Sequence, residues 1–275
     1  MNPTNPTNPT TDHDEIRGAV RKNYGKIASA TAAGCGCSSA TCCAAPAGAT
    51  AADISLQLGY SQAEVSGVPE GANLGLGCGN PQAIAALAPG ETVLDLGSGG
   101  GFDCFLAARA VGETGQVIGV DMTPEMISKS RQNAGKAGFT NVDFRLGELE
   151  NLPVADGIAD VIISNCVINL SPEKQRVFRE AFRVLKPGGR LAVSDVVRTA
   201  DMPDSVKKDL AMHTGCIAGA SSVPELELML CRAGFTDIRI KPKNESRTFI
   251  RDWAPGAGIE NYIVSAVIEA IKPGE

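Results

Sequence analysis

The stretch "ETVLDLGSGGGFDCFLAARAVG", residues 91–112, decides the fold. It begins with a short apolar run, Thr92–Leu96, which predicts a buried strand. A glycine-rich turn follows, and then a segment with helical character that begins near Gly101. Further along, "GQVIGVD" predicts a second strand that ends in Asp121. A strand, a glycine turn, a helix and a second strand with an acid at its end together predict a nucleotide-binding βαβ unit.

The acidic residue in front of the glycine turn narrows the choice of nucleotide. Asp95 stands two residues before Gly97, in the pattern D-x-G-x-G-x-G. A dinucleotide would lay its anionic pyrophosphate on this turn, where a carboxylate so close by would repel it. S-adenosylmethionine has no phosphate, and its sulfonium and ammonium are attracted to a carboxylate. The pattern therefore favours S-adenosylmethionine, with Asp121 expected to accept hydrogen bonds from the ribose hydroxyls.

The region after the second strand continues the alternation of helix and strand. "MTPEMISKSRQNAGKAGF" predicts a helix opened by Thr123 and Pro124. "NVDFRLGELENLP" predicts a third strand whose Glu148 is expected to reach the adenine amino group. "ADVIIS" predicts the fourth strand, "SPEKQRVFREAFRVL" a helix capped by Ser171, and "KPGGRLAVSDVV" a turn into the fifth strand. This alternation predicts an α/β fold with a doubly wound, Rossmann-like sheet.

Composition limits the class of protein. The chain has 275 residues, 43% of them hydrophobic, which is enough to bury a sizeable core. Its net charge of -6 argues against a nucleic-acid partner, which would favour a basic face. No apolar run approaches the roughly 18 residues of a membrane span, and the first residues lack the pattern of a signal peptide. We therefore expect a soluble, cytoplasmic protein that binds small molecules, with no membrane or nucleic-acid partner.

Three parts of the chain differ in character. Residues 1–70 hold a repeated Asn-Pro-Thr tail, expected to be disordered, then a helical segment from Asp14 and a cysteine-rich stretch. Residues 71–197 hold the expected cofactor-binding domain. Residues 198–275 are mostly helical at first and strand-like later, which predicts a C-terminal α+β domain.

The nine cysteines are expected to be reduced thiols, since the chain shows no export signal. Four of them cluster near the N-terminus with a spacing unlike the C-x2-4-C pairs of structural zinc sites, which leaves a mobile loop or a collection point for soft metals. Cys104 and Cys231 lie on predicted helices and are expected in the core. Cys166 instead follows the strand 159–163, at the edge where parallel sheets hold ligands. The four clustered residues are Cys35, Cys37, Cys42 and Cys43.

Five motifs after residue 51 carry a resemblance to a known family. They are "LGLGCGNP", "VLDLGSGGGFDCFLAARAVG", "VIGVDMTPEMI", "ISNCVINLSPEKQ" and "HTGCIAGA". With them the chain closely resembles the arsenite S-adenosylmethionine methyltransferases. The glycine turn alone would indicate only the broad class I methyltransferases, whereas "SNCVINL" and the two other cysteine motifs are specific. The resemblance implies an enzyme that methylates arsenite, or its thiol adducts, with S-adenosylmethionine.

The resemblance also implies a site in which three cysteines, Cys78, Cys166 and Cys216, bind trivalent arsenic as thiolates. Arsenic(III) is soft and prefers sulfur, and with three ligands it keeps a lone pair. That lone pair is expected to attack the sulfonium methyl in line, without a general base, so that most of the catalysis is positioning. The expected cofactor-binding residues are Asp95, Gly97, Ser98, Gly99, Gly101, Asp121, Met122, Glu148 and Asn165.

The family scheme further implies a reductant. Methylation oxidises arsenic to the pentavalent state, and protein thiols are implied to reduce it while forming a disulfide. Thioredoxin or glutathione would then reopen that disulfide. The C-terminal domain is implied to cover the site and to bring Cys216 to it.

Two alternatives and two residues stay open. A methyltransferase of another small metabolite would use the same central domain, and it should survive loss of Cys166 and Cys216. A non-catalytic soft-metal binding protein would bind arsenite but gain nothing from S-adenosylmethionine. His213 either serves the site or is a capping or surface residue, and Asp195 either faces the site or caps a turn.

Overall fold

The computed structural model describes residues 9–30 and 49–274. Residues 1–8 and the four cysteines of the N-terminal cluster, Cys35, Cys37, Cys42 and Cys43, lie outside this description. Helix α1 (Pro9–Ser29) begins before Asp14, so the disorder expected for residues 9–13 is wrong. A proline in the first turn of a helix sacrifices no hydrogen bond and already has the helical φ, which permits this early start.

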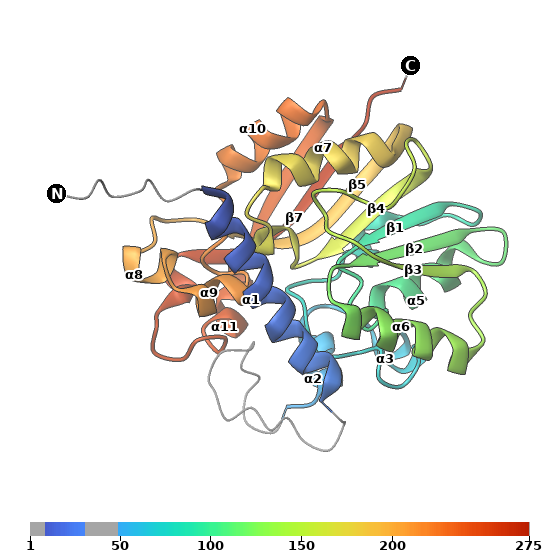
Figure 1. Cartoon of the computed structure of the whole chain (residues 1–275), viewed down its shortest axis with the longest axis horizontal. Helices are drawn as coiled ribbons and strands as arrows, with labels where there is room; N and C mark the ends of the chain where they lie inside the picture. The colour runs from blue at the N-terminus through green and yellow to red at the C-terminus, as the bar shows by residue number, and fades with distance from the viewer. Residues whose placement is uncertain (1–8, 31–48, 275) are drawn as a thin grey trace.

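A seven-stranded sheet forms the centre of the molecule (Figure 1). Its strand order is β3-β2-β1-β4-β5-β7-β6, in which the first five strands are parallel and β7 runs antiparallel to both neighbours. The prediction of an α/β, doubly wound sheet is confirmed. The strands are β1 (Thr92–Leu96), β2 (Gln116–Asp121), β3 (Val142–Leu146), β4 (Ala159–Asn165), β5 (Leu185–Arg198), β6 (Thr236–Lys243) and β7 (Ile263–Ile271).

The order of the strands creates a crevice at one edge of the sheet. From β1 the chain runs outward through β2 and β3, and then it returns to the other side of β1 as β4. Leu96 near the end of β1 pairs with Ser164 near the end of β4. Such a reversal of strand order leaves room between the loops that follow the two strands, and ligands of α/β proteins bind there. The ends of β1 and β4 therefore locate the site.

Helices cover both faces of the sheet. Val93 and Leu94 are consecutive in β1 and point to opposite faces, so each belongs to a different core cluster. Val93 packs with residues of α5 and α6, such as Phe105 and Ile127, and Leu94 packs with residues of α7 and α10. The helices are α2 (Ala51–Gln57), α3 (Gln62–Gly67), α4 (Gln82–Ala85), α5 (Phe102–Val111), α6 (Pro124–Ala137), α7 (Lys174–Val184), α8 (Asp204–Lys207), α9 (Leu210–Thr214), α10 (Val223–Ala233) and α11 (Arg247–Ile250), with short 3-10 turns at Ile168–Leu170 (η1), Asn244–Ser246 (η2) and Ile259–Asn261 (η3).

The C-terminal strands complete the central sheet. β7 pairs with β5 from Arg190 through Arg198, and β6 pairs with the other edge of β7. Residues 198–275 therefore share one sheet with the part that carries β1, β2 and β4. Between β5 and β7 the chain forms α8 and α9, which lead to Cys216.

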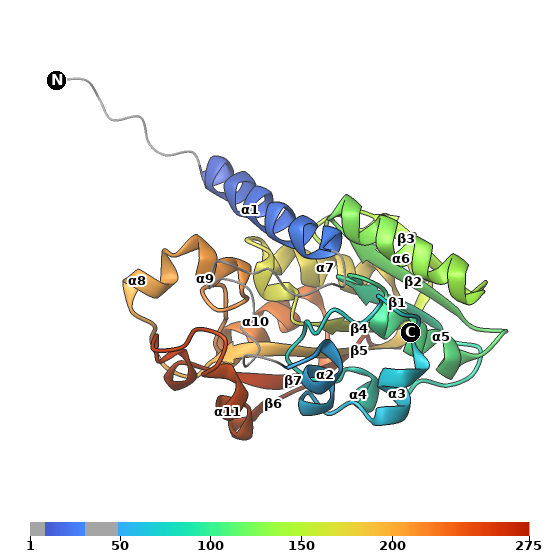
Figure 2. The same ribbon diagram turned by 90° about the horizontal axis from the view of Figure 1, so that it is seen from below.

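Helix α1 lies across the edge of the sheet that holds the crevice (Figure 2). It packs against α6 on one side and α9 on the other, so it bridges the two halves of that edge. Val20 of this helix is buried in the contact. Arg17, whose side chain is 12% exposed, lies 2.7 Å from a Glu173 oxygen and 3.2 Å from a Glu150 oxygen. The helix is therefore held by a partly buried ion-pair cluster as well as by apolar contacts.

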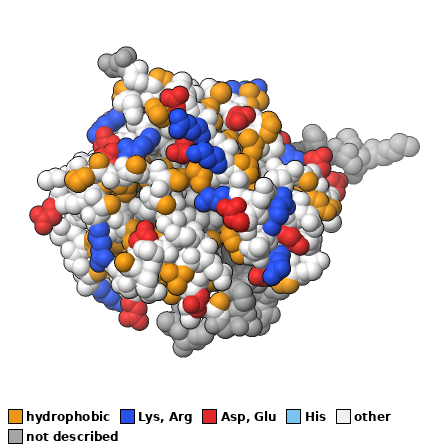
Figure 3. Space-filling view, turned by 180° about the vertical axis from the view of Figure 1, so that it is seen from behind, with side chains coloured by type: hydrophobic (Ala, Val, Ile, Leu, Met, Phe, Trp, Pro, Cys, Tyr) orange, Lys and Arg blue, Asp and Glu red, His pale blue; other side chains and the backbone are white. Residues whose placement is uncertain are grey.

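The outer surface carries charges of both signs. Figure 3 shows the side of the molecule opposite to the view of Figure 1, where Lys and Arg side chains alternate with Asp and Glu among the described residues. No described helix is both long enough and apolar enough to cross a bilayer.

We expect Arg17→Gln to loosen α1, because the change leaves the buried carboxylate of Glu150 without its cation. The free energy of unfolding should fall by about 2 kcal/mol, less than the roughly 3–5 kcal/mol for breaking a fully buried ion pair, because Glu173 is partly exposed. Urea titration measures this change. Arg21→Gln on the same helix is the control, since Arg21 is 44% exposed and its pair with Glu148 should contribute less than about 1 kcal/mol. Equal losses from both variants would contradict the prediction.

Candidate active site

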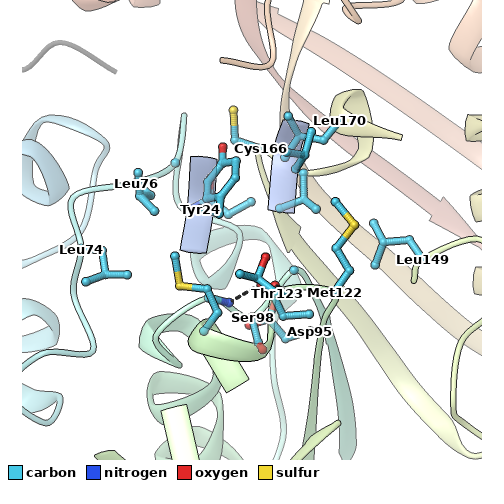
Figure 4. Close-up of a pocket in the computed structure, with 18 of the residues that line it drawn as sticks. Tyr24, Leu74, Leu76, Asp95, Ser98, Met122, Thr123, Leu149, Cys166 and Leu170 are labelled. Carbon is cyan, nitrogen blue, oxygen red and sulfur yellow. Dashed lines mark hydrogen bonds between the residues drawn. The ribbon is translucent and has the colours of Figure 1, made fainter. Parts of the chain in front are cut away.

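A cavity of about 1160 Å³, its open mouth included, lies at the carboxyl ends of β1, β2 and β4 (Figure 4). Much of its wall comes from the glycine turn after β1, the end of β2, the loop after β4, helix α1 and the segment around residues 72–77, and Leu149 after β3 and Cys216 after α9 also contribute. In Figure 4, Tyr24 of α1 and the side chains of Leu74 and Leu76 stand on the side of the cavity opposite Leu149. Segments far apart in the sequence thus enclose one space.

The glycine turn after β1 approaches its neighbours too closely for side chains. Gly97 has a φ of +79°, and a Cβ there would collide with the side chain of Val167. The amide groups of Gly97 and Ser98 both donate to the carbonyl of Val120, at 2.8 and 3.0 Å, which ties the turn to β2. A backbone in this left-handed region favours glycine. The turn therefore presents glycine backbone to the cavity.

Asp121 holds the opposite side of the turn. One of its oxygens accepts a hydrogen bond from the Gly99 amide at 3.0 Å, and the other accepts from the Thr123 amide at 2.8 Å. Burial raises the pKa of Asp121, although these two amide bonds act to lower it. The carboxylate at the end of β2 is thereby fixed in the wall of the cavity.

Around the glycine turn, the carboxyl groups of two buried residues and one partly exposed residue line the cavity, which favours a cationic ligand. They belong to Asp95, Asp103 and Asp121. Burial, with a further contribution from Asp103, raises the pKa of Asp95 well above its ordinary value. Burial also raises the pKa of Asp103 to about 6. A sulfonium or ammonium bound beside these groups stabilises their ionised forms.

The residues present fit S-adenosylmethionine. Ser98 lines the cavity, and its buried hydroxyl has no hydrogen-bond partner in the described part of the chain. A buried polar atom without a partner indicates a missing ligand or water. Together with the acidic wall and the bare glycine turn, it matches a small cationic cofactor with hydroxyl groups.

Cys166 follows β4 at the edge of the cavity. It is one of four described non-glycine residues with positive φ, at +58°. Cys216 is another, at +63°, and its Sγ donates a hydrogen bond to the carbonyl of Cys166 at 2.8 Å. Such backbone conformations cost energy and gather at functional sites. The two thiols are therefore held together by an unusual loop geometry that their sequence motifs do not reveal.

Cys78 lies behind the cavity wall, beside Cys166. One ligand atom from each of Cys78, Cys166 and Asp195 lies within 4.8 Å of the other two. Gly77 lines the cavity, whereas Cys78 itself is only 1% exposed. The structure thus brings all three predicted cysteines to one region, with Cys166 in contact with both of the others.

The three thiols have raised pKa values. Burial raises the pKa of Cys78, with the neighbouring charge of Asp195 adding to the effect. The hydrogen bond with Cys216 lowers the pKa of Cys166, but Cys78, burial and Asp195 outweigh it and raise that pKa well above its ordinary value. The pKa of Cys216 is also raised well above its ordinary value, first by the hydrogen bond with Cys166 and then by burial. All three groups are therefore protonated at neutral pH.

Asp195 belongs to the site, although the sequence left it unassigned. It lies in β5, three residues before the strand ends, and is buried. Its carboxylate accepts hydrogen bonds from the Ile168 amide at 3.0 Å and from the side chain of Asn169 at 2.9 Å. Burial raises its pKa to about 6, while the Val196 amide and other donors act to lower it. Its signal in the sequence is an acid inside an apolar strand.

Two sequence predictions need correction, and a third stays a prediction. The carboxylate of Glu148 pairs with Arg21 at 2.5 Å, and Glu148 directly precedes Leu149 and Glu150 of the cavity wall, so its contact with the adenine amino group remains a prediction. Glu173, not Ser171, is the N-cap of α7, and the Ser171 hydroxyl accepts from the Glu173 amide instead. Cys231 is exposed, because α10 turns Leu226 and Leu230 inward and leaves the next position outside.

The remaining residues singled out in the sequence have the following positions. Cys104 is buried as predicted, and its thiol donates to Asp95 at 3.1 Å. Met122 and Asn165 line the cavity. A ring nitrogen of His213 lies 3.2 Å from the Leu170 carbonyl, and His213 is not in the wall of the cavity.

The fold and the cavity define a class I, S-adenosylmethionine-dependent methyltransferase. Residues 87–234, more than half of the chain, match the family model described as a methyltransferase domain. The chain is 56% identical over 268 residues to the arsenite methyltransferase of Halobacterium salinarum, which covers 95% of this chain and 68% of that protein. The chain therefore belongs to the arsenite methyltransferase family.

Two further comparisons agree. The human arsenite methyltransferase is 40% identical over 55% of this chain, and the match spans 43% of the human protein. The crystal structure of the arsenic(III) S-adenosylmethionine methyltransferase of Chlamydomonas reinhardtii superposes with a TM-score of 0.59 at 34% identity, over 83% of this chain and 74% of that one. This chain thus spans about two thirds of the archaeal relative and less than half of the human one.

The raised pKa of Asp195 predicts a pH-dependent stability difference between the wild type and Asp195→Asn. Between the ordinary pKa of 3.8 and about 6, the folded protein keeps a proton that the unfolded chain has lost. The contribution of Asp195 to the free energy of unfolding therefore falls as pH rises through this interval, by about 3 kcal/mol. Urea titrations of both proteins from pH 4 to 7 measure it, because the other carboxylates cancel in the difference. Parallel curves for the two proteins would contradict the assignment.

Proposed function

We propose that this chain transfers methyl groups from S-adenosylmethionine to trivalent arsenic bound by Cys78, Cys166 and Cys216. The observation that carries the proposal is the meeting of these three buried thiols, from distant segments, beside a cavity built for a cationic cofactor. Three thiols in one place suit a soft ion that takes three sulfur ligands. The activity named for the archaeal and human relatives supports the same reaction.

Binding of arsenite needs no separate base. Each As–OH group exchanges with one protonated thiol, so that an As–S bond forms and the hydroxide leaves with the thiol proton as water. Three exchanges release three waters and leave a neutral complex. Protonated thiols are the form that burial favours here, and a neutral product suits a buried site.

The protein's part in the methyl transfer is positioning. S-adenosylmethionine supplies an electrophilic methyl group. The carboxylates of Asp95 and Asp121 hold the cationic cofactor, the three sulfurs direct the arsenic lone pair, and Tyr24 and the other apolar side chains of the wall exclude water. The lone pair becomes the new As–C bond while the S–C bond breaks, so arsenic is oxidised by two electrons.

Return to trivalent arsenic requires two electrons from thiols. Two thiols supply them and form a disulfide, which thioredoxin or glutathione reopens. We place this cycle in the cytoplasm, since reduced thiols persist there. Residues 71–197 supply the cofactor-binding part, and residues 198–275 complete the arsenic site through Cys216.

A methyltransferase of another small metabolite is the rival function, and the cysteines distinguish the two. We expect Cys78→Ser, Cys166→Ser and Cys216→Ser each to lower arsenite methylation by about 100-fold or more, because a lost sulfur misplaces the arsenic. Their affinity for S-adenosylmethionine should stay within about 3-fold of the wild type. The matched control is Cys231→Ser, which changes an exposed thiol and should methylate as the wild type does.

The readout is methylated arsenic, separated and quantified after incubation with arsenite, S-adenosylmethionine and a thiol reductant. Isothermal calorimetry measures the cofactor affinity. A folded wild type that binds S-adenosylmethionine yet yields no methylated arsenic would overturn the proposal and direct the search to metabolite acceptors.

A further inference from the structure

A buried hydrogen-bond network joins the segment that carries Cys78 to the end of β4. The side chain of Asn165 is at its centre. Its Oδ1 accepts a hydrogen bond from the Cys78 amide at 3.0 Å, and its Nδ2 donates to the Gly79 carbonyl at 2.8 Å. A primary amide can donate and accept at once, so this side chain binds a peptide segment in the way a neighbouring strand would.

Tyr60 and Asp103 determine which way this amide faces. The Tyr60 hydroxyl donates to Asp103 at 2.8 Å, which leaves a lone pair to accept from Asn165 Nδ2 at 3.0 Å. A flipped amide would set its NH2 group against the Cys78 amide, which is also a donor, and its oxygen against the Asp103 carboxylate. Tyr60 and Asp103 are 4% and 8% exposed, so water cannot easily replace these bonds.

The segment around Cys78 lies directly against this network. A Cβ on Gly77 would stand 2.8 Å from Asn165 Nδ2, and Gly77 has a φ of +130°. On the other side, Ser265 of β7 donates to the Cys78 carbonyl at 2.6 Å. Both peptide groups of Cys78 are thus held, one by Asn165 and one by Ser265.

Asn165 directly precedes Cys166 in the chain. One residue therefore anchors the first thiol through its side chain and the second through its peptide bond. Asp103 at the far end of the network also lines the cofactor cavity. The network spans the distance from the cofactor side of the cavity to Cys78.

We propose that Asn165 is a positioning residue that holds Cys78 beside Cys166, and that Tyr60 and Asp103 keep its amide in the required orientation. This inference rests on the proposed function, since it takes Cys78 as an arsenic ligand. Asn165 acts through Cys78. If the side-chain amide of Asn165 loses its orientation, Cys78 leaves the arsenic site and only two thiols remain there.

The test compares two arsenicals. Arsenite has three exchangeable hydroxyls and uses three thiols, whereas phenylarsonous acid has two and uses two. We expect Asn165→Asp and Tyr60→Phe to weaken arsenite binding by about 10-fold or more, the loss that follows from a broken buried hydrogen bond. Binding of phenylarsonous acid should stay within about 3-fold. Asn165→Asp keeps the shape and places an oxygen where the donor was, and Tyr60→Phe keeps the ring that packs on Phe102.

A double-mutant cycle and a control complete the design. In a Cys78→Ser background, Asn165→Asp should weaken arsenite binding no further, because the thiol it positions is gone. The control is Asn141→Asp, which changes an amide bonded to the Ala108 and Gly112 carbonyls, away from the cavity, and should leave both arsenicals unaffected. Thermal unfolding establishes that each variant is folded.

The binding results distinguish failure of the role proposed for Asn165 from failure of the proposed function. Unchanged arsenite binding in folded Asn165→Asp would overturn the inference. Equal losses for both arsenicals would overturn it too, because Asn165 would then act on the whole site and not on Cys78. If Cys78→Ser itself leaves arsenite binding unchanged, the proposed function fails at that ligand, whatever Asn165 does.

Discussion

The parallel pairing of β1 with β4 is the constraint on which the rest of the site depends. Because both strands run in the same direction and end side by side, the glycine turn after β1 and Cys166 after β4 open at one edge of the sheet. The backbone hydrogen bonds between these two strands thereby place the glycine turn and Cys166 in the wall of one cavity. All other parts of the site, including helix α1, are added around this edge.

Burial sets the electrostatic character of the two halves of the cavity. On the cofactor side, Asp95 and Asp103 lose solvation that a cationic ligand would restore. On the thiol side, burial and mutual proximity keep the sulfurs protonated, which suits exchange with As–OH groups and leaves no net charge to solvate. The same physical cause, removal from water, therefore prepares one half for a cation and the other for a neutral, soft substrate. One carboxylate oxygen of Asp195 lies within 4.8 Å of the sulfurs of Cys78 and Cys166, and burial raises the pKa of Asp195 as well.

Local patterns and long-range contacts differed in how well they could be predicted. The glycine turn, the strands and the burial of Cys104 follow from short-range periodicity and were correct. Glu148 pairs with Arg21, which is 127 residues away in the chain, so the sequence pattern could not indicate this ion pair. Cys231 was expected in the core because it follows Leu230 in an apolar helix. The buried face of α10 is formed by Leu226 and Leu230, and Cys231 lies just outside that face.

The sequence by itself determined the α/β fold, because its strands and helices follow their local periods, and the cofactor class, because Asp95 precedes the glycine turn. The three cysteine motifs were identified through the resemblance to a known family. Only the tertiary structure decided that α1 closes the cavity, that Asp195 joins the thiols and that Asn165 holds Cys78. These contacts bring together residues from distant parts of the chain, 87 positions apart for Asn165 and Cys78. Their geometry depends on the order of strands in the sheet and on left-handed backbone turns at Cys166 and Cys216, neither of which any local pattern encodes.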